Sequence, residues 1–259
     1  MEHENFSAAA ANFPDPFRLL IRDRVESTND EVRALAEMGA AEGLIILAKK
    51  QTLGRGRRGA AWFSQGDNSL TFSILVRSEK SKVLWSRLAL TAGLALAESM
   101  ESYGLDVGIK WPNDILIKGK KVAGILVEAA DDFAIVGIGI NVNTAEFPPE
   151  ISSIATSLKL AASQSFSRAH LLEKIIQHFA QRRRQMINDF GQIISAVQQR
   201  CVLTGNGVIL NTAGGSKTGT VEGISSEGEI LLRTEMGLER LIEGSEVRLL
   251  KKCDCVHSF

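Results

Sequence analysis

The sequence is short of cysteine, of net charge and of aromatic residues. Its 259 residues include three cysteines, 30 basic and 30 acidic side chains, and only 6% aromatic residues. Cys201, Cys253 and Cys255 form no Cys-x-x-Cys pair, so they predict neither a disulfide framework nor a structural zinc site. The balanced charge excludes a general basic surface of the kind that binds nucleic acid without specificity. Any anion that this chain binds must be held locally.

The chain also lacks a long apolar run. Its first residues, MEHENFSAAAANFPDPF, do not have the basic start and apolar stretch of a secretory signal. No later run reaches the length that a membrane span needs. With 44% hydrophobic and 23% charged residues, the composition is typical of a globular protein. We therefore predict a cytoplasmic protein without membrane contact, in which residues 1–18 are disordered or extended and residues 253–259 form a tail.

Periodicity predicts a mixed sheet with helices packed on it. ESTNDEVRALAEMGA is typical of a helix that starts with a capping box, Thr28 with Glu31, and GLIILAKKQ is typical of a buried strand. The run KVLWSRLALTAGLALAESMESYG is apolar nearly all round, so we expect a helix buried against the sheet, with Gly104 as its stop. The turn residues PND, KGKK and ADD then break three strand-like runs, which predicts an antiparallel meander.

The sequence pattern changes from helical to strand-like towards the carboxy terminus. SRAHLLEKIIQHFAQRRRQMINDFG predicts an amphipathic helix with Arg182 to Arg184 on its solvated side. From Cys201 onward, five short runs separated by glycine turns predict a small β-barrel: GVIL, KTGTVEGI, GEILLRT, LERLIEG and EVRLL. The expected division is a large domain over residues 19–200, which holds the motifs described next, and a barrel over residues 201–252.

The most unusual motif is GRGRRG. Gly54, Gly56 and Gly59 allow positive φ and close approach to a ligand, and arginine offers a planar set of donors that suits carboxylate or phosphate. The motif is neither the Gly-x-x-x-x-Gly-Lys phosphate loop nor the Gly-x-Gly-x-x-Gly dinucleotide motif. Taken alone, it also fits a flexible surface loop or an RGG-like contact to RNA.

Three further motifs are modest when taken singly. In KWPND a lysine and an aromatic residue precede a turn, which a plain strand connection would also explain. Lys121 in GKKVAGILVE stands before a hydrophobic strand, where a lysine also marks a solvated strand end. In GIGINVN the strand ends with Asn141 and Asn143, whose amides suit either a ligand or a turn.

Together these motifs resemble one family. Ser27-Thr28-Asn29, Gln51 to Trp62, Lys110 to Gly124 and Gly137 to Asn143, in this order, are similar to the biotin protein ligases over roughly residues 20 to 250. The resemblance implies an α+β fold, a mixed and largely antiparallel sheet with packed helices of the class II synthetase-like type, followed by an SH3-like barrel. It also implies the reaction: ATP, accompanied by Mg²⁺, activates biotin as biotinyl-5′-AMP, and the biotinyl group then passes to a carrier lysine.

The resemblance also implies roles for residues. Three are implied to act in catalysis: Lys121 on the biotinyl carboxylate and phosphate, Arg57 as a phosphate clamp, and Asp114 as the partner of the incoming lysine. The residues implied to bind biotin are Ser27, Thr28, Asn29, Gln51, Gly54, Arg55, Gly56, Arg57, Lys121 and Gly124. Those implied to bind the nucleotide are Arg57, Arg58, Gly59, Trp62, Lys110, Trp111, Asn113, Lys121 and Asn141. No residue is assigned as a metal ligand.

The implied partner is a biotin carboxyl carrier protein or domain of acetyl-CoA carboxylase or a related carboxylase. Some members of the family carry an amino-terminal helix-turn-helix domain and act as repressors. Ser27 comes too early for such a domain, so we predict a ligase that does not bind DNA, and both a monomer and a homodimer stay open. Two other functions also stay open: a lipoate or octanoate ligase, and an RNA-binding module, which the zero net charge and the single tyrosine disfavour.

Overall fold

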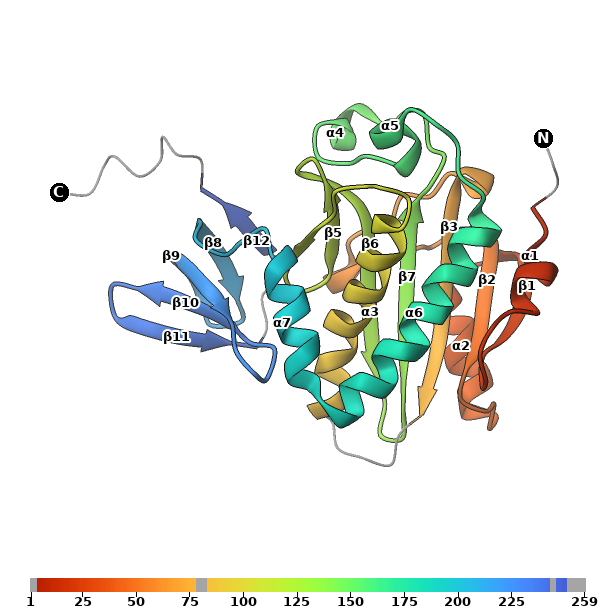
Figure 1. The fold of residues 1–259 in the computed structure, drawn as a ribbon, viewed down its shortest axis with the longest axis horizontal. Coiled ribbons are helices and arrows are strands. Elements are labelled where there is room, and N and C mark those ends of the chain that lie inside the picture. Colours follow the sequence, from red (N-terminus) through yellow and green to blue (C-terminus); the bar gives the residue numbers. More distant parts are fainter. Residues whose placement is uncertain (1–3, 78–82, 243–245, 251–259) are drawn as a thin grey trace.

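The computed structural model describes residues 4–77, 83–242 and 246–250, and its centre is a mixed sheet of seven strands within those ranges (Figure 1). The strands are β1 (Arg18–Val25), β2 (Leu44–Gln51), β3 (Ser69–Arg77), β4 (Gly108–Lys110), β5 (Asp114–Ile117), β6 (Lys120–Ala129) and β7 (Phe133–Asn141). Their order across the sheet is β1-β2-β3-β7-β6-β5-β4. β1 pairs parallel with β2, and the other neighbours pair antiparallel.

Helices lie on both faces of this sheet. On one face, α2 (Thr28–Glu37) packs Val32 and Ala36 against Leu75 of β3 and Ile135 of β7. The opposite face carries α3 (Val83–Glu101), α6 (Arg168–Asn188) and α7 (Phe190–Arg200), which lie in front of the sheet in Figure 1. Because α2 has only 10 residues, part of its sheet face is left for other groups.

The apolar segment that predicts a buried helix forms α3. Leu88, Leu94, Leu96 and Met100 are fully buried, since α3 lies between the sheet and α6. The chain reverses at Gly104 with φ of +78°, a conformation that favours glycine at a helix end. The predicted burial of this helix is therefore confirmed.

The meander has one strand more than expected. β4, β5, β6 and β7 are neighbours in both sequence and space, and each pair is antiparallel. The extra strand is β4, which spans only three residues before the PND turn. Lys118 and Gly119 link β5 to β6 and both have positive φ, as in the two-residue turns that suit a twisted hairpin.

The carboxy-terminal strands form a second sheet. Its strands are β8 (Gly207–Thr212), β9 (Gly215–Ile224), β10 (Ile230–Thr234), β11 (Gly237–Leu241) and β12 (Glu246–Leu249). Over the described residues their order is β11-β10-β9-β8-β12, with all neighbours antiparallel. The five runs predicted as strands match these five elements, and the α+β fold class is confirmed.

The two sheets meet at a turn of the second one. The indole Nε1 of Trp111 donates to the backbone oxygen of Gly228 at 3.0 Å. Beside it, Arg87 of α3 pairs with Glu227 at 2.5 Å and lies over the ring of Phe190. The turn between β9 and β10 therefore sits against α3, α7 and the KWPND segment at once.

Part of the amino-terminal segment differs from the expectation that residues 1–18 are disordered or extended, and residues 1–3 lie outside the described residues. Phe6–Ala10 form the helix α1, and Phe6 and Ala9 are buried against α6. The Glu4 carboxylate accepts hydrogen bonds of 2.8 Å from the backbone N–H groups of Arg168 and Ala169. Because this carboxylate caps the first turn of α6, a contact remote in sequence orders a segment whose own composition favours disorder.

The triple arginine of α6 is another correction. Arg182 donates to both oxygens of Glu98 on α3, and Arg183 donates to Glu42 and to the backbone oxygen of Arg77. These two side chains are therefore partly buried links rather than a solvated face. Burial also lowers the pKa of Arg183.

The remaining helices are short. α4 (Pro149–Ser152) and α5 (Leu158–Ala162) lie near the top of the sheet in Figure 1. Among the described residues, no helix has both the length and the apolar character to cross a membrane. Cys201 is a half-buried free thiol, and Cys253, Cys255 and the predicted tail lie outside the described residues.

Candidate functional site

The cavity lies on the α2 face of the large sheet, where glycines replace side chains. Gly137 and Gly139 of β7 share this face, and Gly124 of β6 is the cross-strand partner of Gly139. A Cβ atom on Gly139 would lie 2.3 Å from Trp62 Cε2, and one on Gly137 would lie 2.2 Å from Asn29 Oδ1. The floor is therefore bare backbone, against which side chains from outside the sheet can lie.

The first turn of α2 brings polar groups to one side of this floor. Ser27, Thr28 and Asn29 line the cavity and are each less than 5% exposed. Thr28 donates to Gln51 Oε1 from its backbone N–H at 2.7 Å and from its hydroxyl at 2.9 Å. The predicted capping box is thus wrong: Ser27 is the N-cap, and the Thr28 side chain serves Gln51 rather than the helix.

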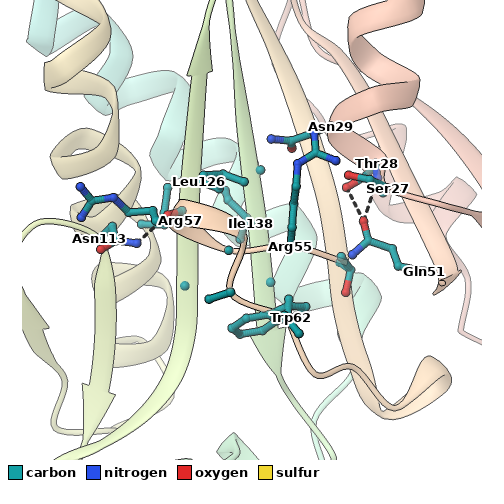
Figure 2. A pocket seen from close by; sticks show the side chains of 18 of the residues that line it. Ser27, Thr28, Asn29, Gln51, Arg55, Arg57, Trp62, Asn113, Leu126 and Ile138 are labelled. Atoms are coloured by element: carbon teal, nitrogen blue, oxygen red, sulfur yellow. Dashed lines mark hydrogen bonds between the residues drawn. The ribbon is translucent and has the colours of Figure 1, made fainter. Parts of the chain in front are cut away.

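The arginine loop, residues 54–62, folds back over the floor (Figure 2). Gly56 N donates to Ala60 O at 2.6 Å, and Trp62 N donates to Gly54 O at 2.9 Å. At the tip Arg58 has φ of +54°, which is uncommon for a residue other than glycine. The loop places the Trp62 indole on Gly124 and Gly139, and its buried Nε1 has no acceptor among the described residues.

The two arginines of this loop that line the cavity take different directions. Arg55 extends towards Asn29, whereas Arg57 lies beside Asn113 on the other side of the cavity (Figure 2). Arg55 donates to both oxygens of Asp30, at 2.5 and 2.6 Å, and to Glu128 at 3.2 to 3.3 Å. The hydrogen bond from Arg55 holds the pKa of Asp30 below its usual range.

Lys121 stands on the side of the cavity opposite α2. Its Nζ lies 2.6 Å from Asp114 Oδ1 and 5.7 Å from the centre of the Trp62 ring. Asn113 Nδ2 donates to Ile125 O, and Ile125 N donates to Asn113 O, so the PND turn is fixed to β6. This side of the cavity carries a lysine, a carboxylate and an amide within one hairpin.

The structure brings most of the sequence-predicted residues together. Those that line the cavity are Ser27, Thr28, Asn29, Gln51, Arg55, Gly56, Arg57, Trp62, Asn113, Asp114, Lys121 and Gly124. Those outside its lining are Gly54, Arg58, Gly59, Lys110, Trp111 and Asn141.

Three of the residues outside the lining have visible structural roles. A Cβ on Gly54 would lie 2.8 Å from Gln51 Nε2, so this glycine makes room for the Gln51 amide. Trp111 is 2% exposed and donates to the second sheet instead of facing the cavity. Asn141 donates to Thr156 O at 3.1 Å, and its buried Oδ1 has no donor among the described residues.

Several residues of the site were not assigned from the sequence. They are Ala60, Ala61, Thr71, Ile125, Leu126, Gly137, Ile138 and Gly139 in the lining, and Asp30, Ser73 and Glu128 behind it. The spacing of the two glycines in GIG was a usable signal, because residues i and i+2 of a strand share a face. Glu128 gave no such signal, since its partners come from elements distant in sequence.

Nothing in the described residues forms a ready metal cage. No group of three or more histidine, cysteine, aspartate or glutamate side chains is placed to hold an ion there. The cavity instead offers cations and amides on two sides of an uncharged floor, which suits a ligand with a polar neutral part and an anionic part.

Comparison with known families gives two matches along the chain. The profile described as the biotin/lipoate A/B protein ligase family matches residues 22–144, and the one described as the biotin protein ligase C-terminal domain matches residues 204–250. The first region holds all the lining residues of the cavity, and the second covers β8 to β12.

Individual proteins are similar over most of the chain. The bifunctional ligase/repressor BirA of Bacillus spizizenii is 37% identical over 232 residues, covering 86% of this chain and 71% of that protein. The biotin–[acetyl-CoA-carboxylase] ligase of Paracoccus denitrificans is 31% identical over 239 residues, covering 86% and 97%. The structure of the biotin protein ligase of Aquifex aeolicus with biotin and ATP has a TM-score of 0.82 at 32% identity, covering 90% and 99%.

Proposed function

This chain belongs to the biotin/lipoate A/B protein ligase family, and from that premise we propose how its cavity works as a biotin protein ligase. The enzyme activates biotin with ATP as biotinyl-5′-AMP and transfers the biotinyl group to a lysine of a carrier protein. One observation supports this function best: the polar groups of Thr28, Asn29 and Gln51 and the cations Arg57 and Lys121 line the same glycine floor. Biotin has the matching form, because its ureido ring is polar and neutral and its side chain ends in a carboxylate.

In the first step a biotin carboxylate oxygen attacks the α-phosphorus of ATP. An O–P bond forms, and the bond to the departing pyrophosphate breaks. Two anions must approach each other, and their repulsion amounts to several kcal/mol even in a partly screened site. Lys121 and Arg57, on the hairpin and loop sides of the cavity, offset this charge and hold the reacting groups in place.

In the second step the carrier amine attacks the acyl carbon of the mixed anhydride. An N–C bond forms and the C–O bond to AMP breaks, while the nitrogen of the neutral amine loses one proton. Asp114 is placed to accept a proton, because it lines the cavity and its side chain is 21% exposed. Asp114 also forms an ion pair with Lys121, which acts in the first step, because Lys121 Nζ lies 2.6 Å from Asp114 Oδ1. Exchange of this ion pair for contacts to substrate would link the two steps.

The substrate triphosphate is proposed to arrive with Mg²⁺. Among the described residues lining the cavity, Asp114 is the acidic one, so the protein supplies few ligands of its own. This donor set fits an ion that keeps its waters and binds mainly to phosphate oxygens. Such an ion neutralises phosphate charge when it is bound.

The carrier is proposed to be a biotin carboxyl carrier protein or domain. The name of the Paracoccus denitrificans relative, which the chain covers almost entirely, gives acetyl-CoA carboxylase as its acceptor. A cytoplasmic location and the absence of DNA binding stay predictions, and both a monomer and a homodimer stay open.

A calorimetric titration tests the substrate directly. Purified protein would be titrated with biotin and separately with lipoate, each in the presence of Mg²⁺ and a nonhydrolysable ATP analogue. We expect heat from biotin and none from lipoate. Heat from lipoate alone would contradict the assigned substrate and favour the lipoate branch of the family.

A further inference from the structure

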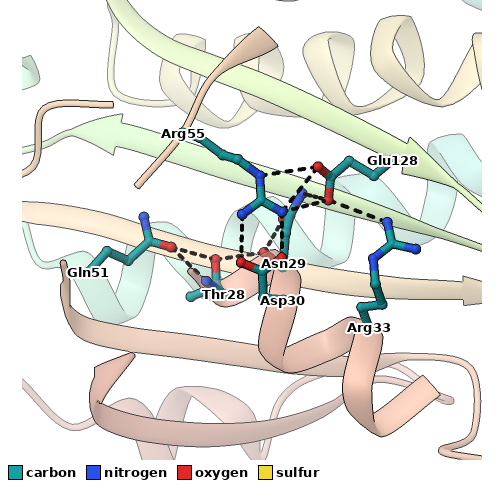
Figure 3. A network of polar contacts seen from close by, with 8 residues as sticks. Thr28, Asn29, Asp30, Arg33, Gln51, Arg55 and Glu128 are labelled. Atoms are coloured by element: carbon teal, nitrogen blue, oxygen red, sulfur yellow. Dashed lines mark hydrogen bonds and ion pairs between the residues drawn. The ribbon is translucent and has the colours of Figure 1, made fainter. Parts of the chain in front are cut away.

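One carboxylate touches both parts of the site that recognition of biotin requires. Glu128 of β6 accepts a hydrogen bond from Asn29 Nδ2 at 3.0 Å, and it accepts further bonds from Arg55 at 3.2 to 3.3 Å (Figure 3). Its side chain is 22% exposed. Arg33 of α2 forms a second ion pair with Glu128, with its Nη2 3.6 Å from Glu128 Oε2. The first turn of α2 and the arginine loop are therefore joined through β6.

The guanidinium of Arg55 is fully engaged by this arrangement. Nη1 and Nη2 each donate to one oxygen of Asp30, and Nε and Nη2 donate to Glu128. An arginine has five N–H donors in a planar fork, and here the whole outer edge of that fork faces carboxylates. These carboxylates raise the pKa of Arg55. The cation of Arg55 is neutralised inside the protein before any substrate anion arrives.

The side-chain amide of Asn29 is also fixed by contacts at both ends. Its Oδ1 lies 2.6 Å from the Ser73 hydroxyl, its Nδ2 points to Glu128, and its face lies against Gly137. A side chain fixed at both ends keeps its remaining donor and lone pair in a set direction. Loss of the Glu128 charge would release the Nδ2 end.

We propose that Glu128 is a positioning residue that fixes the arginine loop and Asn29 together, and that the Arg55 side chain is the anchor of the loop rather than a clamp on substrate anions. The kinetic part of this inference rests on the proposed function, whereas the structural part does not.

If Arg55 binds substrate instead of anchoring the loop, the same substitutions should change substrate affinity in the opposite direction. If its cation binds the substrate carboxylate or phosphate, Asp30 and Glu128 compete with that anion. Removing either negative charge would then tighten binding. If Arg55 is an anchor, the same change loosens the loop and weakens binding, so the sign of one measurement separates the two.

The test compares Glu128→Gln with a matched control, Glu101→Gln. Glu101 also accepts two hydrogen bonds from one arginine, Arg200, at 2.7 and 2.8 Å, and its side chain is 31% exposed. It lies outside the cavity lining. Neither change adds or removes a trypsin site, and trypsin cleaves after Arg55, Arg57 and Arg58. Cleavage within residues 54–62 of the ligand-free protein therefore reports on anchoring without any need for activity.

We expect cleavage of the loop to be several times faster in Glu128→Gln than in Glu101→Gln, at equal thermal stability. In adenylate formation, KM for biotin should rise about tenfold in Glu128→Gln, the change that corresponds to about 1.4 kcal/mol for one charge-assisted contact. The rate at saturating biotin should change less than KM, because the reacting groups are untouched. Glu101→Gln should leave both constants as in the wild type.

A graded second variant keeps the test decisive if Glu128→Gln folds poorly. Asp30→Asn removes one carboxylate partner of Arg55 and leaves the bond from Asn29 to Glu128 in place, so it should speed loop cleavage and raise KM for biotin by less than Glu128→Gln. Its control is Asp132→Asn, which breaks the exposed pair to Arg77 at 2.6 Å. Loop cleavage equal to that of the controls, or a lower KM for biotin in either variant, overturns the inference. If loop cleavage is faster in the variants but the wild-type protein does not use biotin, the proposed function alone is overturned and the inference about anchoring stands.

Discussion

The α2 side of the cavity and the hairpin side differ in how their polar groups are held. On the α2 side, Thr28, Asn29 and Arg55 bond to other side chains of the protein, and these partners come from β2, β3 and β6. On the hairpin side, Asp114 is the ion-pair partner of Lys121 among the described residues, and the Lys121 ammonium lies over the Trp62 ring. The first side is suited to a neutral ring that requires fixed hydrogen-bond directions. The second is suited to charge that changes during a reaction.

The largest expected effect falls on the hairpin side. Changing Lys121 to Ala should slow adenylate formation by about a hundredfold to a thousandfold, the range seen when one preorganised charge-stabilising group is lost. Pyrophosphate release measures this rate. The matched control is Lys120→Ala, because the Lys120 ammonium donates to Ser152 O away from the cavity. Equal rates in the two variants would remove the distinction between the sides.

Substitution of Gly137 and Gly139 on the cavity floor tests whether the Asn29 side of the cavity is more rigidly packed than the loop. An added methyl on Gly137 meets the Asn29 amide, which is held by Ser73 and Glu128, whereas one on Gly139 meets the Trp62 indole of the loop. Gly137→Ala should lower the free energy of unfolding by about 1–3 kcal/mol, as overpacking does. Gly139→Ala should cost less, because the loop can move aside. Urea unfolding of both variants gives the comparison, and a larger loss for Gly139→Ala would reverse it.

A smaller effect is expected for Arg57. Arg57→Ala should speed the escape of biotinyl-5′-AMP about tenfold, the change for one charge-assisted contact to phosphate, with little change in thermal stability. Dissociation of the adenylate after rapid gel filtration would report this. Arg58→Ala is the paired control, since Arg58 is in the same loop but outside the lining. An equal loss of adenylate in both variants would mean that loop charge in general, and not Arg57, retains it.

The smallest effect concerns the pH dependence of the α2 side. The hydrogen bond from Arg55 lowers the pKa of Asp30 in the folded protein below its ordinary value of 3.8. The pair therefore contributes stability above that value, and the contribution is lost as the pH falls from about 4 through the folded pKa. The difference in unfolding free energy between wild type and Asp30→Asn should be constant from about pH 5 to about pH 7 and shrink below about pH 4. A constant difference down to pH 2 would contradict the assigned pair.

The sequence predicted the elements of this protein better than their contacts. The strands of the second sheet and the buried helix α3 follow from local apolar patterns, and they occur in the structure at the residues that these patterns predicted. Phe6–Ala10 were misjudged because the order of α1 depends on Glu4 capping a helix more than 160 residues away. Arg182 and Arg183 were misjudged for the same reason, since α3 and the residues before β2 supply their carboxylates.

The candidate site shows the same limit. Motif residues such as Gln51, Arg57 and Lys121 were found because their types and order are distinctive, and the structure brings them into one cavity. Asp30 and Glu128 were not found, because a carboxylate on a helix or strand is ordinary in sequence and becomes informative only beside Arg55. Trp111 was placed with the nucleotide by its motif, although its indole reaches the second sheet.

The bond from Trp111 to Gly228 bears on how the protein unfolds. The indole is in the core of the large sheet, while its acceptor belongs to a turn of the small one, and Arg87 and Phe190 enclose the same turn. Detaching the small sheet would break this hydrogen bond and would expose apolar surface on α3 and α7 to water. The two sheets should therefore melt together in one cooperative transition, with the KWPND segment as part of the seam that joins them.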